Sequence, residues 1–343
     1  MGIFPVTFGP RAFVFDQAVR QRVTFRNYGE GAGGGLPVAD DGRETYPAVQ
    51  ANTDLVYPTN AQIGCLGGQA SPGTCFRDSG LTVAGGVPAP GAASRVDHFA
   101  ALFRQQDAAG SVPTFNYLVL PNDHTNGTTP GAPTPKALIA DNDLGLGQIV
   151  DLVSHSSIWE KSAIIVVEDD SQDGADHVDA HRMPAFVISP WARTDGAAVH
   201  TRYDQYSALR TAELLAGLEP LSINDALATP MYDAFRTDGR PDTRPYDAIV
   251  PEQSLTETNP QGAAGAALSR AMPFDEVDLV PQAILDRLLW QSVHGAGSTP
   301  PAPGPNASEA EHERAQVALR LVRRGADPRA FMARTGEAED EDG

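Results

Sequence analysis

The sequence predicts an α/β protein built on a mostly parallel sheet. Three short apolar segments, at 115–120, 163–167 and 185–189, have the length and the β-branched and aromatic content typical of buried strands. Segments with helical spacing of apolar residues lie between and beyond them. Strands that alternate with helices are typical of a parallel sheet covered on both faces.

The individual elements follow in chain order. A helix at 11–20 precedes a strand at 23–26, and a second helix is expected at 95–106 before the strand that Pro121 ends. The apolar positions of 137–154 and of 206–217 predict two more helices, with Gly217 as the C-cap of the second. In that helix we expect three leucines to point inward: Leu209, Leu214 and Leu215. A last helix is expected at 277–294.

The chain is long enough for a large domain, with 343 residues of which 41% are hydrophobic. We expect one large domain at 1–296, interrupted by a Gly- and Pro-rich insertion at 31–92. Long irregular insertions are often lids or substrate loops, and disorder is the alternative. Residues 297–343 are expected to be a linker, a charged helix and an acidic tail.

Charge and hydropathy exclude several partners. The net charge of −19 argues against nucleic acid and anionic membranes, because both require clustered Lys and Arg. No apolar run approaches the ~20 residues that span a bilayer, and the first residues do not resemble an export signal. Cys65 and Cys75 are close enough in the chain to form a disulfide, and the sequence leaves this open.

The most informative segment begins where the strand at 163–167 ends. Six Asp or Glu and two His lie between Glu168 and His181. Ligands of open α/β sheets bind at the carboxyl ends of strands, and adjacent carboxylates are relieved by a bound cation. Oxygen-rich sites with one or two imidazoles suit a divalent metal such as Ca, Mn, Zn or Mg. A single Asp at such a position would more simply be a helix cap or a solvated loop residue.

The strand at 115–120 carries a second group of polar residues at its end, Asp123 and His124. Parallel strands would bring both groups to one edge of the sheet. Carboxylates, imidazoles and a metal together fit metal-assisted hydrolysis of a phosphoester. The expected substrate is a small-molecule or lipid phosphoester, and the sequence does not distinguish between them or fix the oligomeric state.

Several motifs also resemble the bacterial phosphoesterase family of the alkaline phosphatase superfamily, which includes phospholipases C and acid phosphatases. The matching segments are Leu120-Pro-Asn-Asp-His-Thr125, Ala140-Asp-Asn-Asp143, Val167-Glu-Asp-Asp170 and Asp176-His-Val-Asp-Ala-His-Arg182. They look most like a branch that is often fused to a β-propeller. The resemblance covers roughly residues 10–295 and implies an alkaline-phosphatase-like three-layer sandwich.

The resemblance also implies roles for individual residues. Asp169, Asp170 and His181 would bind the metal. The catalytic residues would be His124, His177, Asp123 and Asp176, with the histidines contacting phosphate or metal. Ser171 stands where phospholipase C relatives have a histidine, which His181 would replace.

The front of the chain departs from the family. Relatives begin with a strand ending in a Glu-Asn metal-ligand pair, and this chain has no Glu-Asn pair. The resemblance therefore implies that about the first third of the catalytic domain is missing, possible export signal included, so the cellular location stays undetermined. The alternative to an enzyme is an inactive or fragmentary module of the same fold that acts in binding or structure.

The remaining polar residues are expected to be ordinary. Thr125 and Ser171 are the hydroxyls beside the motifs, and we expect loop hydrogen bonds for both. Asp141 and Asp143 are expected to cap the start of the helix after the 123–136 loop, and a role facing the site is the alternative. His98 and His155 are expected to be surface or packed histidines on helices.

Overall fold

The computed structural model describes residues 13–29, 47–54, 77–80, 94–122, 124–168, 183–274 and 280–300, together with residue 320. The helices and strands in these ranges occur in the order α1 (Val14–Gln21), β1 (Phe25–Tyr28), α2 (Pro47–Ala51), α3 (Arg95–Ala108), β2 (Phe115–Leu118), α4 (Pro135–Ser154), β3 (Ile164–Val167), β4 (Ala185–Ile188), α5 (Gln205–Ala216), α6 (Ile223–Leu227), α7 (Ala266–Ala271) and α8 (Gln282–His294). Within them, no helix is both long and apolar enough to cross a membrane.

The strands form two pairs. β1 and β2 are parallel, with Phe25 opposite Phe115 and Tyr28 opposite Leu118. β3 and β4 are antiparallel, with Val167 opposite Ala185. The α/β class and the positions of the strands therefore agree with the sequence, whereas the antiparallel second pair was not predicted.

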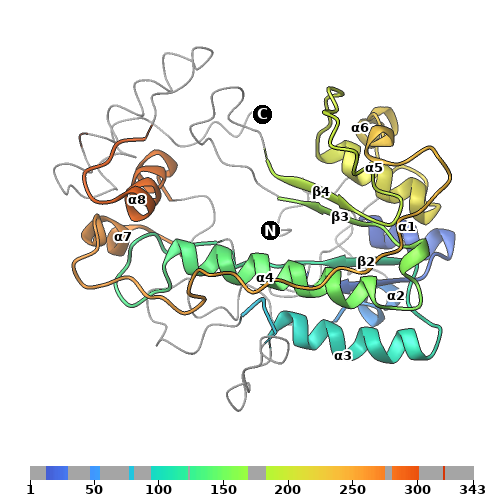
Figure 1. Cartoon of the computed structure of the whole chain (residues 1–343), viewed down its shortest axis with the longest axis horizontal. Coiled ribbons are helices and arrows are strands. Elements are labelled where there is room, and N and C mark those ends of the chain that lie inside the picture. Colours follow the sequence, from blue (N-terminus) through green and yellow to red (C-terminus); the bar gives the residue numbers. More distant parts are fainter. Residues whose placement is uncertain are drawn as a thin grey trace.

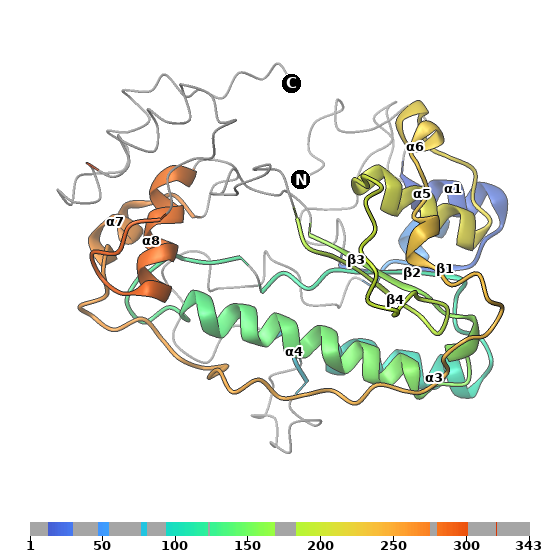
Figure 2. The same ribbon diagram turned by 45° about the horizontal axis from the view of Figure 1, so that its top comes forward.

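Helices lie on both sides of the strands (Figures 1 and 2). α3 and α4 lie on one side, and α1, α5 and α6 lie on the other. The residues of the first core come from α3, α4, β1 and the turn before β3: Tyr28, Val96, Phe99, Phe103, Ile149, Val153 and Trp159. The second core joins α1, β1 and the end of α5, and consists of Val14, Phe15, Ala18, Phe25, Val49 and Leu218. The complete three-layer sandwich stays a prediction.

The helix ends follow from local side-chain chemistry. Ser94 caps α3 by accepting a hydrogen bond from the Asp97 N–H, and Thr134 caps α4 by accepting one from the Ala137 N–H. Pro135 occupies the first turn of α4, where its missing N–H costs nothing. Gly217 ends α5 with φ of 74°, as its predicted C-cap role requires.

Two predictions about burial were wrong. Leu214 and Leu215 are 43% and 57% exposed, whereas Leu209 packs against the second core as expected. The strand β3 is only partly covered, with Val167 40% exposed. A periodic pattern identifies a helix, but which arc of the helix is covered depends on the neighbouring elements.

A buried pair of carboxyl groups joins α5 to α6. Asp225 accepts hydrogen bonds from the backbone N–H groups of Leu221 and Ser222 at 2.6 and 2.7 Å. Glu213 is 1% exposed and accepts a bond from Arg210 through one carboxyl oxygen, while its Oε1 has no donor among the described residues. Burial and the hydrogen bond to Asp225 raise the pKa of Glu213 to about 7. Below about pH 7 Glu213 therefore holds a proton that it can share with the ionised Asp225.

We expect this pair to make stability depend on pH. The folded state binds the Glu213 proton more tightly than the unfolded chain does, so the unfolding free energy decreases as the pH rises from about 4.5 to about 7. The contribution is at most about 3 kcal/mol. Glu213→Gln keeps a donor toward Asp225 at every pH, and should gain stability relative to the natural chain between pH 5 and pH 8 in urea unfolding.

The exposed Glu219 provides the matched control. Glu219→Gln should follow the natural chain across the same pH series. Parallel curves for Glu213→Gln and the natural chain would contradict a shared proton.

Candidate active site

The described strands do not form the single sheet edge that we expected, because β2 pairs with β1 and β3 pairs with β4 in two separate sheets. β2, α4 and β3 follow one another in the chain, and α4 runs opposite to both strands, so that the carboxyl ends of β2 and β3 face the same side of the molecule (Figures 1 and 2). This is the end at which α/β proteins bind ligands.

The loop after β2 presents His124 at this end. The side chain of His124 is exposed, and its Nδ1 lies 3.0 Å from the carbonyl oxygen of Pro121. The backbone N–H of His124 donates to the same oxygen at 3.2 Å. A carbonyl only accepts, so Nδ1 carries the proton of the neutral ring and Nε2 carries the lone pair. In the neutral ring Nε2 is thus a proton acceptor, and it becomes a donor only when the ring is protonated.

Glu168, the last described residue after β3, is hydrogen-bonded to residues before and after β4. The Glu168 N–H donates to the Pro184 carbonyl at 3.4 Å, and the Glu168 carbonyl accepts from the Gln205 side chain at 3.2 Å. Most predicted site residues lie outside the described residues: Asp123, Asp169, Asp170, Asp176, His177 and His181. Within the described part of the chain, no three His, Cys, Asp or Glu side chains are grouped as a metal site requires. Cys65 and Cys75 also lie outside it.

A buried set of polar side chains holds the start of the loop after β2. We call it the Asp78 network, and its members are Arg77, Asp78, Ser79, Arg95, Asn122, Asp141 and Asn142. At its centre the fully buried side chains of Arg95 and Asp78 form an ion pair of 2.7 Å. The second Asp78 oxygen accepts the backbone N–H of Asn122 at 2.8 Å and the amide of Asn142 at 3.1 Å.

Asp141 completes the network from α4. Its carboxylate accepts hydrogen bonds from the Asn122 amide and the Asp78 N–H, both at 2.7 Å. Its other oxygen accepts from Ser79 Oγ at 2.5 Å and from Arg77 Nε at 3.0 Å. The expectation that Asp141 caps the helix was wrong, because Thr134 is the cap and Asp141 lies in the second turn, 2% exposed.

The network balances its own charges. Two carboxylates face two guanidinium groups, so that no net charge is buried. Burial raises the pKa of Asp78 to about 6 although the Arg95 guanidinium lowers it. Asp78 is therefore ionised at neutral pH and acts as an acceptor to all three of its donors.

The end of the same loop is held by the C-terminal part of the chain. The amide of Asn259 donates to the carbonyls of Gly127, Thr129 and Pro133 at 3.2–3.3 Å. The N–H of Thr128 donates to Ser269 Oγ at 2.9 Å. Both ends of the loop that contains His124 are thus fixed by side chains from elsewhere in the fold.

Sequence reasoning missed the Asp78 network because its members come from four separate segments. Asp78 lies in the insertion at 31–92, which has no periodic pattern. One signal was available on α4, where Asp141 and Gln148 share the helical face of Ala137 and Leu144. Polar residues on an apolar helix face indicate buried partners. Gln148 confirms the pattern, since its amide exchanges two hydrogen bonds with the backbone of Gly80.

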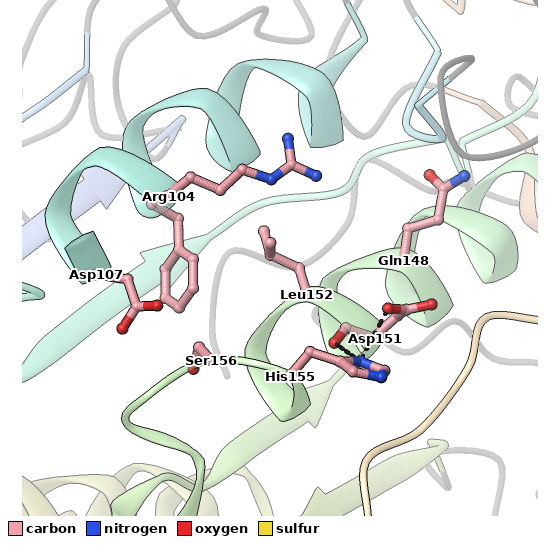
Figure 3. A pocket seen from close by; sticks show the side chains of 8 residues that line it. Arg104, Asp107, Gln148, Asp151, Leu152, His155 and Ser156 are labelled. Carbon is pink, nitrogen blue, oxygen red and sulfur yellow. Dashed lines mark hydrogen bonds and ion pairs between the residues drawn. The ribbon is translucent and has the colours of Figure 1, made fainter.

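A cavity of about 340 Å³ lies elsewhere, between the C-terminal halves of α3 and α4 (Figure 3). Its polar lining residues serve the fold: Asp107 holds Ser157, and Asp151 holds His155 and the backbone of Ala248. Asp151 is ten residues beyond Asp141, or about 15 Å along the helix. The cavity is thus toward the opposite end of α4 from the strand ends, and it is not our candidate site.

Other polar residues have local roles. Thr125 Oγ1 accepts the Gly127 N–H at 3.0 Å, a loop hydrogen bond as expected. His98 on α3 lies 2.7 Å from the Asp54 carboxylate. His155 follows the last turn of α4, with Nδ1 2.9 Å from the Asp151 carbonyl.

The described elements define an α/β protein with a candidate ligand site at the carboxyl ends of β2 and β3. The family model described as Phosphoesterase family matches residues 92–219. This match supports a phosphoesterase family assignment for the segment, which contains both strand ends and all the predicted site residues. No curated protein matches the chain.

The contact between the 77–80 segment and α4 depends on Gly145. A Cβ added there would lie 3.0 Å from the Asp78 Cβ and 3.1 Å from the Asp78 carbonyl carbon. We expect Gly145→Ala to displace this segment and to lower the unfolding free energy by roughly 1–3 kcal/mol, as overpacking does. Urea unfolding measures the change.

Gly147 is the matched control in the same helix, because a Cβ there would meet only the Ala248 Cβ, at 3.9 Å. Gly147→Ala should stabilise by about 0.5–1 kcal/mol through helix propensity. Equal gains from both substitutions would contradict the close approach.

Proposed function

We propose that the chain is a metal-dependent hydrolase of phosphate esters, with its site at the carboxyl ends of β2 and β3. The observation that carries the proposal is the Phosphoesterase family match over residues 92–219, which encloses both polar motifs. The common direction of β2 and β3 supports it, because the carboxyl ends from which the two motifs continue face the same side of the molecule, and α/β proteins bind ligands at such ends.

Each predicted residue has a part in this proposal. His124 is presented with Nε2 as the basic nitrogen, and once protonated it would donate a hydrogen bond to a phosphoryl oxygen or a proton to the leaving oxygen. His177 would do the same from the other strand end. Asp123 and Asp176 precede these histidines in the chain and would support them. In the net hydrolysis the bond between phosphorus and the leaving oxygen breaks, the hydroxyl of one water molecule bonds to phosphorus, and the remaining proton of that water goes to the leaving oxygen.

The metal would be held by Asp169, Asp170 and His181. Two carboxylates and one imidazole suit a divalent cation such as Mn²⁺, Zn²⁺, Ca²⁺ or Mg²⁺. The bound ion would neutralise charge on the phosphoryl oxygens. The chain's net charge of −19 makes such local compensation necessary for an anionic substrate.

The finer family features belong to the same proposal. They are the three-layer sandwich and the likeness to phospholipases C and acid phosphatases. A small-molecule phosphoester is the substrate class that the family match supports, and a lipid phosphoester is the finer possibility.

We expect the purified chain to hydrolyse p-nitrophenyl phosphate or its bis-ester in the presence of one of these four cations, and to stop when a chelator is added. His124→Ala and Asp169→Ala should each lower kcat/KM by about 100-fold or more, the range of general acid–base and charge-stabilising groups. Release of p-nitrophenolate measures both.

His155→Ala is the matched control, since this histidine lines the cavity of Figure 3 rather than the strand ends. It should retain full activity. A loss only in His155→Ala would move the site to that cavity. No turnover by a folded chain with any metal would favour the inactive-module alternative over the enzyme.

A further inference from the structure

We propose that Asp78 is a positioning residue for the candidate active site: through the Asp78 network it fixes residues 120–122, and thereby the orientation of the His124 imidazole. The consequence for activity rests on the proposed function. The consequence for the orientation of the imidazole does not.

The first step of the argument is the number of bonds that hold Asn122. Its backbone N–H donates to Asp78, its amide nitrogen donates to Asp141, and its amide oxygen accepts from Arg95 at 3.2 Å. Backbone and side chain are therefore both held, and Asn122 is 5% exposed. Few orientations of this residue satisfy all three bonds.

The second step leads from Asn122 to the imidazole. On the other side of Pro121, the Leu120 carbonyl accepts a hydrogen bond from Asn142 at 2.6 Å, and Asn142 also donates to Asp78. Residues 120 and 122 are thus both tied to the network, which fixes the Pro121 carbonyl between them. That carbonyl accepts from both the N–H and the Nδ1 of His124.

The third step concerns free energy. Burying an ion pair is costly, and well-packed apolar side chains in its place often give an equally stable protein. Stability therefore does not account for four charged groups at this position. A network of directional bonds specifies a single geometry, which apolar packing does less strictly. The network bonds residues 120 and 122 at the start of the loop that contains His124, so we infer that its geometry serves to position this loop.

The direct test is the tautomer of His124, read from ¹⁵N NMR of the histidine-labelled full chain, with the His124 signals assigned through His124→Gln. The natural chain should show the Nδ1–H form. Asp78→Asn places an N–H donor against the three groups that donate to Asp78, so that at least one of these bonds is lost. We expect the Pro121 carbonyl to be held less firmly and the His124 signals to change to a mixture of tautomers. An unchanged Nδ1–H form in folded Asp78→Asn would overturn the proposal, whatever the activity of the chain.

The activity test uses p-nitrophenyl phosphate with the metal that supports turnover. Asp78→Asn should lower kcat by roughly 10- to 100-fold, the cost of a misplaced catalytic group, with little change in KM. A rise in KM with unchanged kcat, or full activity, would contradict a positioning role. No turnover by the natural chain, combined with a fixed His124 tautomer, would reject the proposed function and leave the positioning intact.

Two further variants separate positioning from folding. Asp16 is another buried carboxylate, 1% exposed, and it bonds the Phe13 N–H at the start of α1. Asp16→Asn should lower the melting temperature without changing kcat or the His124 signals. If Asp78→Asn does not fold, Asn142→Ala removes the neutral link to Leu120 and Asp78, and it should cause a smaller change of the same kind. Unchanged His124 signals in Asn142→Ala would then overturn the proposal.

Discussion

The ion pair between Arg95 and Asp78 is the centre of a network whose members come from four separate segments of the chain. Arg95 begins α3, Asp78 comes from the segment before it, and the two side chains meet beneath the loop that follows β2. Removing water from both charges requires nearly complete hydrogen bonding around them. Asn122, Asp141 and Asn142 supply those bonds, and this requirement determines where the loop begins.

The loop that contains His124 is held at both ends by different means. At its start the loop is hydrogen-bonded to the Asp78 network, which includes residues of α3 and α4. At its end it is tied to the amide of Asn259 and the hydroxyl of Ser269, which belong to the C-terminal part of the chain. Beside Ser269, the core of α7 and α8 is made of Leu268, Met272, Ile284, Leu285 and Leu288. A loop anchored in two separate packed regions is suited to present a reacting group in a constant position.

The Phosphoesterase family match and the geometry describe the same part of the molecule. Residues 92–219 contain α3, β2, α4, β3, β4 and α5, which are the elements around the strand ends. The cavity between α3 and α4 also lies within this segment, and its two carboxylates, Asp107 and Asp151, already accept hydrogen bonds from Ser157 and from the backbone of Ala248 (Figure 3). Chemistry and orientation, rather than the presence of a cavity, therefore favour the strand ends as the site.

The sequence by itself determined most of the elements and led to a candidate position for the chemistry. Apolar runs and helical spacing located β2, β3, β4, α3, α4 and α5 to within a few residues, because these patterns reflect local geometry. His124 was found because polar residues follow a strand. Only the tertiary structure decided that β3 and β4 are antiparallel, that Leu214 and Leu215 are exposed, and that Asp141 bonds Asn122 rather than capping a helix. These features depend on which distant segments meet, and a one-dimensional pattern does not encode the partner of a buried carboxylate.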